Sequence, residues 1–319
     1  MNSLWGWVGF NVAVLAILAL DLGVLHRRSS KVSLREAAIW SAVWVCLSLL
    51  FTAGLYYFKG PPTALEFITG YLIEKSLSVD NLFVFVLIFA YFKVPAAFQH
   101  GILFWGILGA LIMRGIFIAA GSVLLAHFHW VMYIFGAILI LSAYKMLKAG
   151  DDKMDFEKNL AYRFFKRFVP VTNSMDSGKL FIRQDGKLTA TPLLLVLFVV
   201  EVTDLLFAVD SIPAIFAITR DPFIVFTSNV FAILGLRSLY FLLGGLVAKF
   251  HYLKPALAGI LAFVGIKMLL PEKTISIAVS LGVIAAFLLV AILASLRRSG
   301  KPEKNPVAAG APAEESPRP

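Results

Sequence analysis

Long apolar stretches follow one another along most of the chain, and short polar segments separate them. The length of helix that crosses the hydrocarbon core of a bilayer is about 20 residues, and nine stretches approach or exceed this length. They cover residues 5–25, 37–58, 66–91, 101–125, 130–148, 193–217, 223–248, 255–271 and 274–296. The pattern therefore predicts an all-α polytopic membrane protein with about nine transmembrane helices.

Two polar segments stand apart from this pattern. The loop at 149–190 is the longest between predicted helices, and in it Asp185-Gly186 separates the runs KLFIRQ and KLTAT. Asp-Gly suits a type I′ turn, which predicts a small hairpin. The tail at 299–319 is rich in Pro, Ala, Gly and Glu, so we expect it to be disordered. Residues 1–298 are then a single membrane domain.

Composition supports the membrane class and excludes others. Hydrophobic residues make up 60% of the chain and charged residues 15%, whereas soluble domains carry about 25% charged residues. The single cysteine, Cys46, excludes a disulfide framework and a thiolate metal cage. The chain has no nucleophile–histidine pair, phosphate loop or metalloprotease motif. We therefore expect neither an enzyme nor a resident cofactor.

The distribution of Lys and Arg predicts the orientation of the helices. With the N-terminus outside, 21 basic residues fall in inner segments and 3 in outer segments. Cytoplasmic loops of membrane proteins carry such an excess. We expect an outer N-terminus, a cytoplasmic C-terminus and a cytoplasmic loop at 149–190. The net charge of +10 then reflects membrane topology rather than nucleic-acid binding.

Two parts of the chain resemble each other in the same order. The segment EKSLSVDN at 74–81 aligns with DLLFAVDS at 204–211, and Lys145 later aligns with Lys267. This defines repeat A at about 65–148 and repeat B at about 192–271. Each repeat contains three predicted helices. Because three is an odd number, the second repeat is expected to cross the membrane in the opposite direction. An inverted repeat of three plus three helices is typical of secondary transporters, whose substrate site lies near the membrane midplane. The alternative is a duplication kept only for packing.

Ionisable side chains near the middle of the predicted spans form the candidate site, because charges are costly there and mark functional positions. The candidate metal ligands are Glu74, Asp80, Asn81, Glu201, Asp204, Asp210 and Ser211. The predicted spans also contain the basic residues Lys75, Arg114 and Arg237, which we interpret as counter-charges. Five acids minus three bases leave two negative charges, which match one divalent cation.

Helical geometry divides the candidate ligands. At about 100° per residue, Glu74, Ser78 and Asn81 share one helix face, and Asp80 lies on another. Asp204 and Ser211 share the equivalent face of the sixth span, and Asp210 does not.

Pro213 also removes the donor for the carbonyl of Val209, which could add an oxygen ligand. Oxygen ligands favour Mn²⁺, Mg²⁺ or Ca²⁺ over Zn²⁺ or Cu⁺. The alternative is that these acids neutralise Lys75, Arg114 or Arg237 in buried ion pairs.

Two long motifs connect the chain to a known family. GYLIEKSLSVDNLFVF and ATPLLLVLFVVEVTDLLFAVDSIPAIFAIT resemble the TerC family of integral membrane proteins. The length and the segments GKLFIR and TATPL are most similar to its Alx-like branch. The resemblance covers residues 5–296 and implies a bacterial inner-membrane protein of the LysE-like transporter superfamily, linked to tellurium resistance and Mn²⁺ export. The cation-exporting members of that superfamily carry a duplicated acidic motif, and this chain does not match that motif residue by residue.

These observations together predict an inner-membrane secondary transporter that exports divalent metal cations, Mn²⁺ first, by proton antiport. The expected partners are membrane lipid and the cation, without nucleic acid. One alternative is a tellurite or oxyanion transporter that uses Lys75, Arg114 and Arg237 as anion contacts. Another is a non-transporting membrane partner of a metal-stress complex, docking through the loop at 149–190. Oligomeric state, coupling ion and direction of transport are not set by the sequence.

Overall fold

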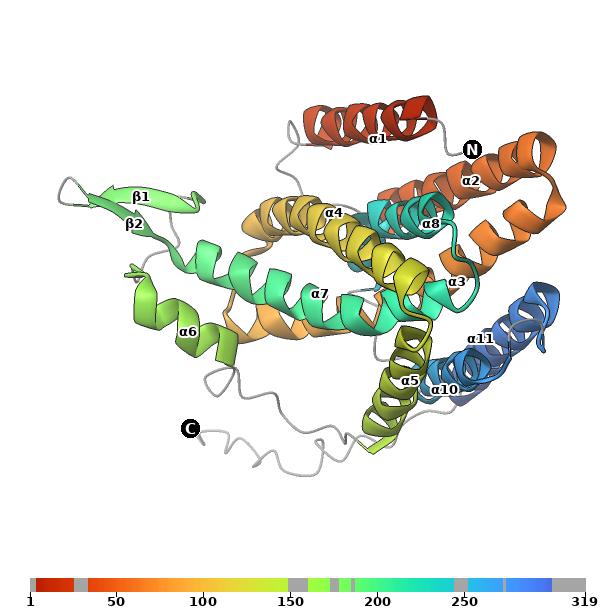
Figure 1. Ribbon diagram of the computed structural model, residues 1–319. Coiled ribbons are helices and arrows are strands. Elements are labelled where there is room, and N and C mark those ends of the chain that lie inside the picture. Colours follow the sequence, from red (N-terminus) through yellow and green to blue (C-terminus); the bar gives the residue numbers. More distant parts are fainter. Residues whose placement is uncertain are drawn as a thin grey trace, which may run out of the picture.

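The computed structural model describes residues 4–25, 34–148, 160–172, 178–184, 187–243, 252–271 and 274–299, most of them in α-helices (Figure 1). The first five helices, α1 to α5, are Leu4–Leu25, Leu34–Lys59, Pro61–Tyr91, Ala96–His127 and Val131–Lys148. The next three, α6 to α8, are Leu160–Phe168, Pro192–Phe216 and Pro222–Leu234. The last three, α9 to α11, are Leu236–Leu243, Leu253–Leu269 and Ile277–Ser299.

Every predicted apolar stretch overlaps a helix, and the multi-pass membrane class is confirmed. Within the described residues, six helical segments are long and apolar enough to cross a membrane. They are Leu34–Lys59, Ala96–His127, Val131–Lys148, Pro192–Phe216, Pro222–Leu242 and Ile277–Ser295. Helix α3 is 31 residues long but contains four Asp, Glu or Lys residues, and α10 has 17 residues. The count of nine spanning helices stays a prediction.

Helix boundaries follow local chemistry. Gly60 has a φ of 91°, which a glycine adopts without strain, and Pro61 and Pro62 then start α3. Asp221 caps α8 by accepting a hydrogen bond from the backbone N–H of Phe223 at 2.9 Å. These two turns separate α2 from α3 and α7 from α8.

A two-stranded hairpin precedes α7, as the sequence predicts. Strand β1, Phe181–Gln184, pairs antiparallel with β2, Lys187–Ala190. The expected turn residues, 185–186, lie outside the described residues. Thr191 follows β2 directly, and its hydroxyl donates to the backbone carbonyl of Lys179 at 2.7 Å. This bond fixes the hairpin to the start of α7.

The helices of the two predicted repeats pack across the boundary between the repeats. Helix α3 packs against α8 and α7, α4 packs against α7 and α8, and α5 packs against α10. In Figure 1, α3 and α8 run from right to left, whereas α4 and α7 run from left to right. In the predicted repeats, α3 corresponds to α7 and α4 corresponds to α8. The contact between α3 and α8 then corresponds to the contact between α7 and α4, and both contacts are present.

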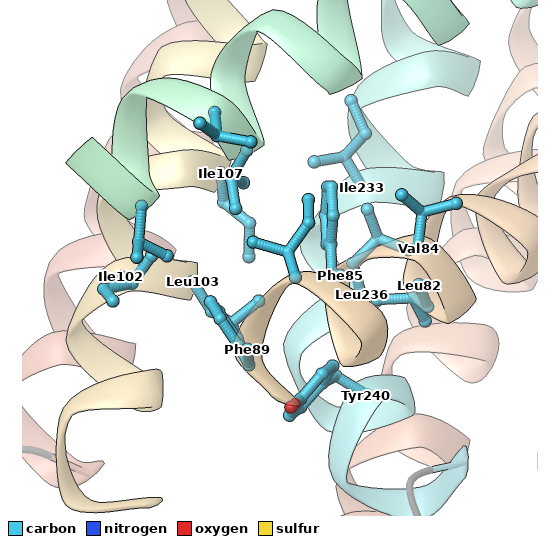
Figure 2. Packing of buried hydrophobic residues seen from close by; sticks show 14 of the residues in the cluster. Leu82, Val84, Phe85, Phe89, Ile102, Leu103, Ile107, Ile233, Leu236 and Tyr240 are labelled. Carbon is cyan, nitrogen blue, oxygen red and sulfur yellow. The ribbon is translucent and has the colours of Figure 1, made fainter. Parts of the chain in front are cut away.

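Buried apolar residues fill the space between α3, α4, α8 and α9. Figure 2 shows this cluster, in which Phe85 and Phe89 of α3 face Leu103 of α4 and Leu236 of α9. The ring centroids of Phe89 and Tyr240 are 5.6 Å apart. The hydroxyl of Tyr240 donates to the side chain of Gln99 at 3.0 Å, so this polar atom is satisfied inside the apolar cluster.

One expected helix, which is found as the single span Pro222–Leu242, contains a one-residue turn. The stretch at 223–248 was expected to form a single helix, but α8 ends at Leu234 and α9 begins at Leu236, with Gly235 between them. The side chain of Lys75 lies against this break and donates to the carbonyl of Ala232 at 3.3 Å. A positive charge at the C-terminal end of a helix offsets the partial negative charge of its free carbonyls.

Other expectations concern residues around these helices. Helix α7 continues through Pro213 to Phe216, so this proline does not end the helix. The predicted tail at 299–319 lies outside the described residues except for Ser299, which ends α11. Residues 244–251, at the end of the predicted seventh span, also lie outside the described residues.

Candidate functional site

Arg114, near the middle of α4, lies at the centre of a buried polar cluster. Only 1% of the residue is exposed. Its Nη1 forms an ion pair with Oε1 of Glu74 from α3. Its Nε and Nη2 donate to the two carboxylate oxygens of Asp204 from α7, each at 3.2 Å. One guanidinium therefore joins acids from both predicted repeats.

Three neutral side chains complete this cluster. Asn229 of α8 accepts from Nη1 of Arg114 at 3.1 Å and donates to Oε2 of Glu74 at 3.2 Å. Ser78 donates to Oε1 of Glu74 at 3.3 Å, and Ser211 accepts from Nη1 of Arg114 at 3.4 Å. The shared helix faces predicted for Glu74 with Ser78 and for Asp204 with Ser211 are confirmed. Asn81 was expected on the face of Glu74, but it lines a cavity with Asp80 instead. Asn229 was missed, and its signal was a lone amide in an apolar stretch.

Apolar layers enclose this cluster along α3 and α4. On α3, Glu74 lies between Phe67 and Leu82, which belong to separate apolar clusters. On α4, Arg114 lies between Ile107 and Ile118, which also belong to separate clusters. Two acids and one base leave one net negative charge in surroundings where unpaired charge is costly. The geometry makes Arg114 a resident counter-cation.

A second group of polar side chains lines a small cavity between α3 and α7. Asp80, Asn81 and Asp210 line this cavity together with Leu77, Met146, Phe207 and Leu261. Its volume is about 20 Å³, which is room for one water molecule or one small ion. Asp80 and Asp210 occupy matching positions in the two predicted repeats, and both line this cavity.

Two side chains in this cavity differ in how their polar atoms are satisfied. Ser142 of α5 donates to Oδ1 of Asp210 at 2.6 Å and orients that carboxylate. Asn81 is 2% exposed, and its Nδ2 has no hydrogen-bond partner among the described residues. Lys254 attracts Asp80, and Lys145 attracts Asp210, so cations stand near both acids. Sequence reasoning named neither Ser142 nor Lys254 as part of a site.

Glu201 lies apart from both groups. It is one turn before Asp204 on α7, and its carboxylate faces Gly109 of α4. A Cβ atom at Gly109 would lie 2.0 Å from Oε1 of Glu201, so the glycine provides the space for this carboxylate. Oε2 of Glu201 is buried and has no hydrogen-bond partner in the described part of the chain.

The three predicted counter-charges have different surroundings. Arg114 holds the two acids described above, and Lys75 caps the end of α8. Arg237 is buried near the start of α9, with 5% of its surface exposed. Of the predicted pairings of Glu74 and Asp204, the one with Arg114 is therefore realised.

The structure thus divides the seven predicted ligands into three places. Glu74, Asp204 and Ser211 surround Arg114; Asp80, Asn81 and Asp210 line the cavity; and Glu201 faces Gly109. Within the described residues, no group of three or more Asp, Glu, His or Cys is arranged to hold a metal ion. The cavity offers two carboxylates and one amide, which are oxygen ligands for a hard cation.

Comparison with known proteins agrees with the motifs. Residues 59–303 match the family described as integral membrane protein TerC family. The chain is 52% identical over 294 residues to the membrane protein STKORF319 of Myxococcus xanthus, covering 92% of each protein.

It is also 49% identical over 297 residues to Alx of Escherichia coli K12, covering 90% of this chain and 92% of the relative. The name of this relative describes it as a candidate membrane-bound redox modulator. No solved structure matches the chain.

Proposed function

Because the chain belongs to the TerC family of integral membrane proteins, we propose that it is a secondary transporter that exports divalent metal cations, Mn²⁺ first. The proposal rests on one observation: Asp80 of α3 and Asp210 of α7 line the same small cavity. The two carboxylates come from matching positions of the two halves. Together they supply two carboxylates to one divalent cation, and Lys254 and Lys145 stand near them.

The chemistry of the cavity favours a hard cation. Asp80 and Asp210 supply carboxylate oxygens, and the amide of Asn81 can supply a carbonyl oxygen. Among the residues lining the cavity, the one sulfur atom is the thioether of Met146, and no His or Cys is present. Zn²⁺ and Cu⁺ bind preferentially to sites that contain His or Cys, whereas Mn²⁺ and Mg²⁺ suit oxygen ligands.

The neighbouring Arg114 cluster supports the position of the ion. Because Arg114 donates to both Glu74 and Asp204, these two acids already have a resident cation. The same contacts use the donors of Arg114 and disfavour its role as an oxyanion contact. We therefore assign Glu74, Asp204 and Ser211 to positioning Arg114, and Asp80, Asn81 and Asp210 to the ion.

An inverted repeat places such a site between two halves that can move against each other. The packing pairs and the opposite directions of α3 and α7 support this architecture for the present chain.

Proton antiport is the coupling that this site suits. Two carboxylates that face one small cavity repel each other when no cation is present, so each gains from binding a proton. A cation entering from one side then displaces protons, and protons arriving from the other side displace the cation. The basic residues at the end of the bundle that holds α6 and the hairpin support a cytoplasmic location for that end.

Metal flux into lipid vesicles that contain only the purified protein tests the proposal. We expect Mn²⁺ to move when a pH gradient is imposed, and protons to move in the opposite direction when a Mn²⁺ gradient is imposed. Zn²⁺ in place of Mn²⁺ should give a much lower flux. If the protein moved neither Mn²⁺ nor Zn²⁺, the proposed function would be wrong. If it moved Zn²⁺ in preference to Mn²⁺, the assignment of the ligands would be wrong.

A further inference from the structure

Helix α6, Leu160–Phe168, turns one face toward the helix bundle. Phe165 is 7% exposed, and its ring lies 5.0 Å from that of Phe198 on α7, measured between centroids. The ring of Tyr162 lies 6.0 Å from that of Phe92, directly after α3. These aromatic contacts attach α6 to the ends of two long helices.

The opposite face of α6 is basic. Arg163, Lys166 and Arg167 are exposed, and Phe164 between them is 60% exposed. The adjacent hairpin adds the exposed side chain of Arg183. Across residues 160–191 the sequence has six Lys or Arg and two Asp, which are Asp176 and Asp185.

The depth of α6 in the molecule indicates what this basic surface meets. Phe92 is the first residue after α3, and Phe198 is six residues into α7. Six helical residues correspond to about 9 Å along the helix axis. Helix α6 therefore lies level with the ends of the long helices, where the phospholipid headgroups of a bilayer are found. Figure 1 shows α6 and the hairpin together at the end of the bundle where α7 begins.

From this juxtaposition we propose that the basic face of α6, with Arg183 of β1, binds the phosphate groups of anionic phospholipids at the membrane surface. Guanidinium groups hold phosphate oxygens through paired hydrogen bonds. Phe164, and Phe181 of β1 at 48% exposure, add apolar surface beside the bases. This combination fits a surface that is charged outside and apolar beneath, as a bilayer is. The proposal does not depend on metal transport.

Lipid binding to the purified full-length protein tests this proposal. The variant Arg163→Gln, Arg167→Gln, Arg183→Gln removes three charges and keeps Lys166, which stacks on the ring of Tyr162 at 4.6 Å. Native mass spectrometry during titration with phosphatidylglycerol or phosphatidylcholine measures the Kd of each retained lipid. A base near a charged membrane surface contributes about fivefold in affinity. We expect the Kd for phosphatidylglycerol to rise at least about fivefold and the Kd for phosphatidylcholine to stay unchanged.

Two control variants separate a site from general charge and from folding. Changing the same three residues to Lys keeps the charge and should keep most of the preference for phosphatidylglycerol. Changing Lys59, Arg220 and Lys273 to Gln removes three charges at other positions and should leave the preference intact. Equal losses in both Gln variants, or an unchanged Kd in the first, would overturn the proposal. In the latter case a soluble acidic partner would become the better occupant of this face.

A label at the surface gives an independent readout. Cys46 is the single cysteine of the chain, so Phe164→Cys in a Cys46→Ser background carries one nitroxide label. In vesicles containing phosphatidylglycerol, we expect this label to be more accessible to lipid-soluble oxygen than to a water-soluble nickel complex. A label that responds mainly to the nickel complex would show that α6 faces water, which contradicts the proposal.

Discussion

Arg114 and Asp204 form a two-point contact in which Nε and Nη2 of the guanidinium donate to the two carboxylate oxygens, each at 3.2 Å. This contact joins α4 of the first predicted repeat to α7 of the second. The remaining terminal nitrogen of Arg114 holds Glu74 of α3. The three charges are thus neutralised mainly by one another, and any transported ion must be held elsewhere.

Substitution of Arg114 should strongly destabilise the protein. Arg114→Gln leaves Glu74 and Asp204 buried side by side without their cation, and breaking a buried pair costs about 3–5 kcal/mol. We expect low abundance in membranes and a lower unfolding temperature in detergent. Adding Glu74→Gln and Asp204→Asn to Arg114→Gln removes all three charges and should restore much of the abundance. If Arg114→Gln alone were as abundant as the parent protein, the structural role of this cluster would be wrong.

The cavity acids should behave in the opposite way. Asp80→Asn and Asp210→Asn each keep the side-chain size and remove one charge from a pair of neighbouring carboxylates. We expect normal abundance and a loss of Mn²⁺ flux in reconstituted vesicles for each substitution. Ser142→Ala, which removes the hydrogen bond to Asp210, should lower the flux less. Full flux in either Asn variant would remove that residue from the transport mechanism.

Gly109 offers a test of Glu201 that leaves the carboxylate chemically intact. In Gly109→Ala, the new methyl group would lie 2.0 Å from the present position of Oε1, so the Glu201 side chain must rotate away. Because this side chain has a flexible end, we expect the protein to fold and the flux to fall. Gly101→Ala is a matched control in the same helix, since nothing lies within 4 Å of a Cβ at that position. Equal flux in the two variants would mean that the position of Glu201 is unimportant for transport.

The crossing of α5 and α10 depends on two glycines. A Cβ atom at Gly265 would lie 2.9 Å from the backbone oxygen of Gly136, and the reverse distance is 3.0 Å. Small residues permit such close approach of membrane helices. Gly265→Ala should therefore cost about 1–3 kcal/mol in stability through overpacking. Gly54→Ala, at an open position of α2, should be neutral or stabilising by up to about 1 kcal/mol. Thermal unfolding in detergent compares the two.

Topology is testable without transport. From the 21-to-3 distribution of basic residues, we expect a reporter fused after Arg298 to lie in the cytoplasm. A reporter inserted after Gly60 should lie outside. The structure is consistent with this separation, because the turn at Gly60 and the hairpin lie at opposite ends of α3 and α7. The reverse pair of results would overturn the predicted orientation of the helices.

Much of the fold was predictable because helix formation and membrane insertion depend on local sequence. The apolar stretches gave the helices α1 to α5, α7, α10 and α11, and the Asp-Gly pair indicated the hairpin. The break at Gly235 was not predictable, since α8 and α9 together read as one apolar stretch. Lys75, which is far away in sequence, meets the end of α8 only after folding.

The sequence alone determined that acids of two related segments lie near the middle of long helices, and that Glu74 and Ser78 share a face. Both are properties of a single helix, since they follow from helix length and from the angle between successive residues. Only the tertiary structure decided which acids Arg114 would neutralise and which would face the cavity. That choice depends on how α3, α4, α7 and α8 rotate and pack, and their contacting residues, Glu74, Arg114, Asp204 and Asn229, lie 25 or more positions apart in the chain.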